Sequence, residues 1–203
     1  MNEGGFRSLL ENHVEGAALD RMVRYAELLE RWSQRHNLVR FSDRRELVER
    51  HLLDALAGAP LLEGSGRLLD VGSGAGLPGV PLLAVSPGWR GVLLEPRHKR
   101  WAFLKMAIRE LDLSAEAEAS RYEDLGGDAR FDLITCRAVG NHEGLLAWAR
   151  ERLVDGGGVA LWTTEDDERR VSRVAGWRVL SWPLVRLQRG RLVLLRAEGP
   201  SST

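Results

Sequence analysis

A glycine-rich segment at residues 68–79, Leu-Leu-Asp-Val-Gly-Ser-Gly-Ala-Gly-Leu-Pro-Gly, constrains the fold of this chain more than any other feature. Its apolar start is typical of a buried strand. Pro78 suits the first turn of a helix because proline has no N–H to leave unpaired. Glycines let the backbone adopt positive φ and approach a ligand. The segment therefore predicts a strand, a ligand-binding loop and a helix in an α/β sheet, where ligands bind outside the carboxyl ends of the strands.

The rest of the chain agrees with this prediction, because short apolar runs alternate with amphipathic helical stretches after Gly66, the clearest at 99–111 and 144–153. Two strand-like runs, 177–187 and 191–196, follow without a helix between them and predict a terminal hairpin. The pattern indicates a mostly parallel sheet with an antiparallel strand near one edge. The expected parallel strands are Arg67–Val71, Gly91–Leu94, Ala115–Ala119, Phe131–Cys136 and Val159–Trp162.

The region before the first strand is predicted to be helical. Apolar residues recur every three or four positions between Leu9 and Trp32. A second helix is expected to begin at Asp43, with Glu46 as its capping-box partner, and to end near Gly58. Residues 1–62 are therefore interpreted as a helical extension, and residues 63–203 as the ligand-binding domain.

Composition excludes several classes of protein. The 29 basic and 29 acidic residues balance, so bulk charge indicates no polyanionic partner, although a local patch can still bind phosphates. Cys136 is the single cysteine and is expected to point into the core. No histidine or cysteine spacing predicts a metal site, no apolar run reaches about 18 residues, and the N-terminus lacks a secretory pattern. We expect a metal-free cytoplasmic protein that does not enter a membrane.

The acidic residues around the glycine loop indicate what it binds. Residues 74–79 fit the dinucleotide fingerprint GxGxxG, but a carboxylate at Asp70 would repel a pyrophosphate. Asp70 instead favours S-adenosylmethionine, which is cationic and has no phosphate. Glu95 ends the next strand 25 residues later, where a carboxylate can accept both ribose hydroxyls. Glu95 suits the ribose of NAD equally well, so it does not distinguish NAD from S-adenosylmethionine.

Further candidates follow the later strands. Tyr122 and Glu123 are placed to read an adenine, with solvated loop charge as the alternative interpretation. Arg137 follows the fourth strand and is expected at the same rim. Cations at a helix start oppose the helix dipole, so Lys99 and Arg100 are candidates for RNA contact rather than for helix stability. A solvated helix start is the alternative.

Several segments resemble one family, the bacterial small-subunit rRNA guanine-N7 methyltransferases called RsmG or GidB. Residues 70–81 resemble its signature loop, and the Leu-Pro-Gly-Val-Pro continuation is more specific than the glycines. Residues 37–39, 50–56, 99–104, 121–123 and 131–138 resemble further family segments in the same order, and the likeness covers about residues 37–158.

The resemblance implies a Rossmann-like class I methyltransferase fold with a seven-stranded sheet, and a protein that binds 16S rRNA or the small ribosomal subunit. The oligomeric state stays open, and a monomer is expected. The resemblance also implies methyl transfer from S-adenosylmethionine to guanine N7. Because N7 carries a lone pair and no proton, no general base is needed and no single acid–base residue is expected. Implied cofactor contacts are Gly72, Leu77, Tyr122, Glu123 and Arg137; Ser73 and Gly74 join them from the loop, and Arg50 and His51 join the RNA candidates.

The chain departs from the family pattern in three places. Val39 and Ala55 replace the usual threonine and serine, and Ala160-Leu161-Trp162-Thr163-Thr164, with no lysine, stands where the family has Leu-Lys-Gly after the fifth strand. Two alternatives therefore stay open: an NAD-binding oxidoreductase, and a catalytically weakened member that keeps only RNA or cofactor binding.

Overall fold

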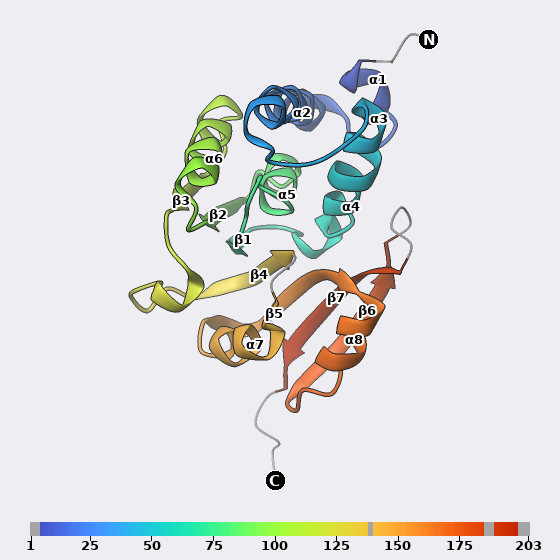
Figure 1. Cartoon of the computed structure of the whole chain (residues 1–203). Helices are drawn as coiled ribbons and strands as arrows, with labels where there is room; N and C mark the ends of the chain where they lie inside the picture. The colour runs from blue at the N-terminus through green and yellow to red at the C-terminus, as the bar shows by residue number, and fades with distance from the viewer. Residues whose placement is uncertain (1–4, 138–139, 185–188, 199–203) are drawn as a thin grey trace.

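The computed structural model describes residues 5–137, 140–184 and 189–198, whose strands form one seven-stranded sheet (Figure 1). The strands are β1 (Gly66–Val71), β2 (Trp89–Leu94), β3 (Ala115–Glu118), β4 (Phe131–Arg137), β5 (Leu153–Thr164), β6 (Trp177–Pro183) and β7 (Gly190–Ala197). Their order is β3-β2-β1-β4-β5-β7-β6. Strands β1 to β5 pair in parallel, and β7 pairs antiparallel with both β5 and β6. The predicted mixed sheet with a terminal hairpin is confirmed; residues 185–187 of its first expected run and 188 of its turn lie outside the described residues.

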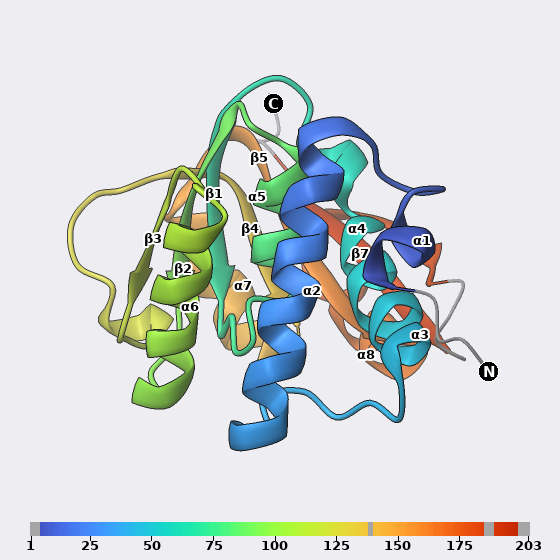
Figure 2. The same ribbon diagram turned by 90° about the horizontal axis from the view of Figure 1, so that it is seen from above.

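Helices cover both faces of the sheet (Figures 1 and 2). One face packs against α2 (Gly16–His36), α5 (Gly79–Val85) and α6 (His98–Glu110), and the other against α7 (His142–Arg150) and α8 (Glu165–Val171). Short helical segments complete the described chain: α1 (Phe6–Leu10), α3 (Arg44–Leu47), the π-helix η1 (Val48–Leu52), α4 (Leu53–Leu56), and the 3-10 turns η2 (Ala59–Leu61) and η3 (Tyr122–Asp124). None of the helices in the described ranges is long and apolar enough to cross a membrane.

The N-terminal segment differs from its prediction in two details. The single helix expected from Leu9 is broken at residues 11–15 into α1 and α2. The Asp43 carboxylate does accept from the Glu46 N–H at 2.8 Å. The Glu46 carboxylate, however, accepts from the Ser42 N–H at 2.7 Å, one residue earlier than a capping box requires. Met22 and Tyr25 of α2 are fully buried in the same hydrophobic cluster as residues of the sheet, so this segment helps to build the core.

The helix α8 is an element that the sequence pattern did not predict. Its first turn holds four acidic residues, which suit the positive end of the helix dipole. The Thr164 hydroxyl accepts from the Asp167 N–H at 3.2 Å and caps the helix. Thr163 and Thr164 thus end β5 and lead directly into this helix. Cys136 is buried on the α7 side, as expected.

Candidate functional site

A pocket of about 300 Å³ opens where the parallel strands end. Its walls come from the ends of β1 and β2 and from the segments that follow β3 and β4, which is where an open α/β sheet binds ligands. Three of the predicted residues, Gly72, Tyr122 and Glu123, contribute to it. The lining residues are Val71, Gly72, Pro96, Ser120, Arg121, Tyr122, Glu123, Gly140 and Asn141.

The glycine loop at the base of this pocket is held in shape by its own backbone. Gly72, Gly74 and Gly76 all have positive φ, at 67°, 58° and 88°. The Ser73 N–H donates to the Leu94 carbonyl at 2.8 Å, and the Ser73 hydroxyl donates to the Asp70 carbonyl at 3.0 Å. Ser73, a predicted ligand contact, therefore ties the loop to β2 and β1 and is itself buried.

From its charge we expected Asp70 to lie at the mouth of the loop, and this prediction is wrong. Its side chain is fully buried, and its Oδ2 accepts from the Gly79 N–H at 3.2 Å. The Thr135 hydroxyl lies 2.8 Å from Oδ1 and donates to it. Burial raises the pKa of Asp70 to about 6, against the lowering effect of these hydrogen bonds. The carboxylate thus joins β4 to the start of α5 beneath the glycine loop.

The start of α5 has no donor left for a phosphate. The Gly79 N–H donates to Asp70, and the Val80 N–H donates to the Gly76 carbonyl at 2.7 Å. Pro78 and Pro81 have no N–H. A pyrophosphate binds to free N–H groups at a helix start, so the start of α5 offers no binding site for the pyrophosphate of NAD. The site therefore still disfavours a phosphate group, but the cause is the lack of free N–H groups rather than the charge of Asp70.

Glu95 lies beside the loop at the end of β2, with 3% of its surface exposed. One carboxylate oxygen accepts from the Gly74 N–H at 3.0 Å, and the other accepts from the Arg97 N–H at 2.8 Å. A carboxylate has about four acceptor positions, so both oxygens keep capacity for ribose hydroxyls. Two neighbouring residues were expected to contact RNA. The Nη1 of Arg100 lies 4.0 Å from the Oε2 of Glu95, and Lys99 is exposed to solvent.

Tyr122 and Glu123 form one wall of the pocket in η3. The Tyr122 ring packs edge-on against Trp148 of α7, with 5.2 Å between the ring centroids. Burial and the neighbouring Glu123 raise the pKa of the Tyr122 hydroxyl, so it stays protonated at neutral pH. The pair offers an aromatic surface and an acceptor side by side, which suits a purine.

Arg137 and Leu77 lie outside the lining of the pocket. Leu77 is 8% exposed within the core, below the loop. Arg137 ends β4 on the face covered by the N-terminal helices, and its Nη1 is buried without a hydrogen-bond partner in the described chain. Burial lowers the pKa of Arg137, while the charge of Asp54 opposes that shift. A buried guanidinium nitrogen without a hydrogen bond is uncommon in folded proteins.

The two RNA candidates of η1 differ in their surroundings. Arg50 is exposed and pairs with Glu46 at 2.8 Å. His51 is partly buried, and its Nε2 lies 3.3 Å from the Arg40 carbonyl. Burial lowers the pKa of His51, and the charge of Arg137 lowers it further, so His51 is neutral at pH 7 and close to Arg137.

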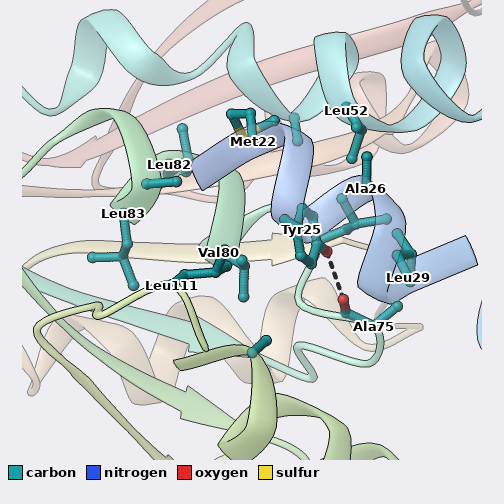
Figure 3. Packing of buried hydrophobic residues seen from close by; sticks show 14 of the residues in the cluster. Met22, Tyr25, Ala26, Leu29, Leu52, Ala75, Val80, Leu82, Leu83 and Leu111 are labelled. Carbon is teal, nitrogen blue, oxygen red and sulfur yellow. Dashed lines mark hydrogen bonds between the residues drawn. The ribbon is translucent and has the colours of Figure 1, made fainter. Parts of the chain in front are cut away.

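The structure also shows contributors that sequence patterns missed. The Tyr25 hydroxyl of α2 donates to the Ala75 carbonyl at 2.6 Å, so the N-terminal segment holds the glycine loop from behind (Figure 3). Ser120 and Asn141 also line the pocket: Ser120 directly follows the predicted strand Ala115–Ala119, and Asn141 lies in the segment after the predicted strand Phe131–Cys136, which is the signal that could have identified them. For Tyr25 the only signal is a hydroxyl in an otherwise apolar helix face.

The sheet order and the pocket at its carboxyl edge define the class I methyltransferase fold. A methyltransferase from Geobacter sulfurreducens superposes with a TM-score of 0.65 at 14% identity over 94% of both chains. A ribosomal protein L11 methylase from Lactobacillus delbrueckii gives 0.63 at 13% identity, over 78% of this chain and 81% of that one.

The chain belongs to the GidB family, rRNA small subunit methyltransferase G, whose family model matches residues 18–173. A ribosomal RNA small subunit methyltransferase G from Xanthomonas axonopodis is 37% identical over 175 residues, 85% of this chain and 82% of the relative. One from Laribacter hongkongensis is 39% identical over 137 residues, 67% of this chain and 66% of the relative.

Proposed function

We propose that this protein transfers a methyl group from S-adenosylmethionine to N7 of a guanine in 16S rRNA of the small ribosomal subunit. The observation that carries this proposal is the pocket at the carboxyl edge of the sheet, in a chain that belongs to the GidB family. The closed donor set at the start of α5 supports a ligand without phosphate over NAD.

The residues around the pocket fit S-adenosylmethionine. We assign the ribose to Glu95, the adenine to Tyr122 and Glu123, and the amino-acid end to the loop at Gly72, where the lack of a side chain lets a ligand approach the backbone. Arg137 has a buried guanidinium nitrogen available for the ligand side of the site. The shape of the loop depends on its own residues Ser73, Gly74 and Leu77, and on Asp70, which is buried beneath it.

Bound S-adenosylmethionine supplies an electrophilic methyl group, which the lone pair of guanine N7 takes up in line with the departing sulfur. No proton has to leave N7, so the side chains of this chain need only bind and orient the two partners. His51, neutral and next to Arg137, and the exposed Lys99 are proposed to face the RNA together with Arg50 and Arg100.

The proposal is tested with small subunits from a strain that lacks the enzyme, incubated with tritiated S-adenosylmethionine and this protein. We expect tritium in 16S rRNA and a single new aniline cleavage site at a guanine, because 7-methylguanine is labile after reduction. Binding of S-adenosylmethionine without transfer would instead support the weakened member. Calorimetric binding of NADH but not of S-adenosylmethionine would support the oxidoreductase.

A further inference from the structure

An apolar patch is exposed on β6, the edge strand of the sheet. Leu180 and Trp182 are 43% and 42% exposed, and they are the large hydrophobic side chains most open to solvent in the described ranges. Both lie on one face of the strand, with the exposed Arg178 two residues before Leu180. No acidic residue occurs in β6. The face therefore combines an aromatic ring, an aliphatic side chain and a cation.

Trp182 borders an apolar groove between the hairpin and the N-terminal segment. One part of the groove, about 320 Å³, is lined by Trp182 on one side and by Pro60 and Leu61 of η2 on the other. A second part, about 350 Å³, shares Ala57, Pro183 and Leu184 with the first and continues along α4 to Asp54. The two parts adjoin, and their size is that of small-ligand sites.

The groove lies on the same side of the sheet as Arg137, at the same level. Arg137 is paired in register with Trp162 on β5, Trp162 with Leu192 on β7, and Leu192 with Trp182 on β6. These residues form a row across four neighbouring strands, and three steps of ~4.8 Å place Trp182 about 14 Å from Arg137.

The N-terminal segment covers the middle of this row. The Trp162 Nε1 donates to the Asp54 carbonyl at 2.7 Å, and a Cβ built on Gly58 would come within 2.6 Å of the Trp162 ring. Trp162 is therefore sealed beneath α4, and Trp182 is the ring of the row that solvent reaches. The row therefore runs from Arg137 at the end of β4, beneath α4, to the exposed Trp182 at the sheet edge.

We propose that the groove beside Trp182 binds an unpaired base of the RNA substrate, close to the guanine that is methylated. The indole ring stacks on the base, which is a contact that tolerates any base, and Arg178 contacts the phosphate backbone further along the strand. This inference rests on the proposed function and adds to it a second, base-stacking site.

A nucleic acid fits this face better than a second copy of the chain. Edge strands that pair with other strands are flat and uncharged, whereas β6 ends in Pro183 and carries Arg178. Two arginines near the hairpin turn are already ion-paired: Arg189 with Asp166 at 3.2 Å, and Arg191 with Glu165 at 2.5 Å. No ion pair involves Arg178 within the described residues.

The test measures KM for unmethylated small subunits and for S-adenosylmethionine in three variants. Trp182→Ala is expected to raise the subunit KM about ten-fold, and Trp182→Phe, which keeps a ring, to stay within about two-fold of wild type. Trp182→Leu separates stacking from apolar contact and is expected to behave like Trp182→Ala. In all three the KM for S-adenosylmethionine stays at the wild-type value, which also shows that the variants fold. Ser181→Ala, on the opposite face of β6, is the control and leaves both values unchanged.

Photocrosslinking identifies the partner directly. The variant Trp182→p-benzoylphenylalanine, irradiated on the small subunit, is expected to crosslink to 16S rRNA. A crosslink to a ribosomal protein or to a second copy, a Trp182→Leu variant with wild-type KM, or an unchanged KM in Trp182→Ala would overturn the base-stacking site. These failures are distinct from failure of the proposed function, in which the wild-type protein itself would transfer no methyl group to the subunit.

Discussion

The glycine-loop edge of the sheet and the terminal hairpin are built on opposite principles. At the loop, polar groups are buried and bonded to backbone: Asp70 to Gly79, Glu95 to Gly74, and Tyr25 to Ala75. At the hairpin, exposed charges pair with one another, as Arg189 does with Asp166 of α8. A buried network holds one geometry, whereas exposed pairs contribute little and adapt. The first edge suits a small ligand of fixed shape, and the second suits a large, flexible polymer.

The largest effect is expected for a change inside the loop. Gly72 has a φ of +67° and lines the pocket, so Gly72→Val places a β-branched side chain where both the backbone and the ligand exclude it. Isothermal titration calorimetry is expected to show no binding of S-adenosylmethionine, with the far-UV circular dichroism of wild type. Gly126→Val, in open space outside the pocket, is the control. An unchanged affinity in Gly72→Val would mean that the ligand binds elsewhere.

A second effect is the pH dependence of stability at Asp70. The folded pKa of about 6 lies above the ordinary value of 3.8 for an aspartate, so this group stabilises the fold most when it is protonated. Its contribution is lost as the pH rises toward and through 6. Between pH 4.5 and pH 7.5 the wild type is expected to lose about 2 kcal/mol relative to Asp70→Asn, which does not titrate. Urea unfolding of both proteins at the two pH values measures this difference, and equal pH profiles would contradict the burial of an ionisable carboxylate.

A smaller effect is expected where the N-terminal segment meets the loop. Tyr25→Phe removes the donor to the buried Ala75 carbonyl and is expected to cost about 1.5 kcal/mol in the free energy of unfolding. The affinity for S-adenosylmethionine falls with it, because the loop loses its support. Trp32→Phe, on the same helix but without contact with the loop, provides the comparison. If Tyr25→Phe bound S-adenosylmethionine as tightly as wild type, the N-terminal segment would contribute to the hydrophobic core but not to the ligand site.

The smallest effect is expected at the hairpin. Arg189→Ala breaks an ion pair with Asp166 in which the two side chains are 62% and 58% exposed, so the free energy of unfolding changes by less than about 1 kcal/mol. Ligand binding stays at the wild-type value. Chemical denaturation at low and high salt checks this, because the difference from wild type should shrink as salt screens the pairs. A loss comparable to that of Tyr25→Phe would remove the contrast between the two regions.

Features encoded by consecutive residues could be predicted from the sequence, whereas contacts between distant residues could not. The strands, the hairpin and the pocket residues Gly72, Tyr122 and Glu123 follow from local patterns, because each is encoded by consecutive residues. The burial of Asp70 does not, since it depends on Thr135 in β4 and on Gly79 in α5, which only the sheet brings together. The support of the loop by Tyr25 joins residues 50 positions apart. The row from Arg137 to Trp182 depends on strand register, which the sequence did not specify.

The most direct test of the account is the structure of the protein with S-adenosylhomocysteine, the product of methyl transfer. We expect its ribose hydroxyls on Glu95, its adenine beside Tyr122 and Glu123, and its amino-acid end over Gly72, with Asp70 still buried beneath the loop. Density for the product outside this pocket, or a diphosphate held by the loop when NADH is supplied instead, would contradict it.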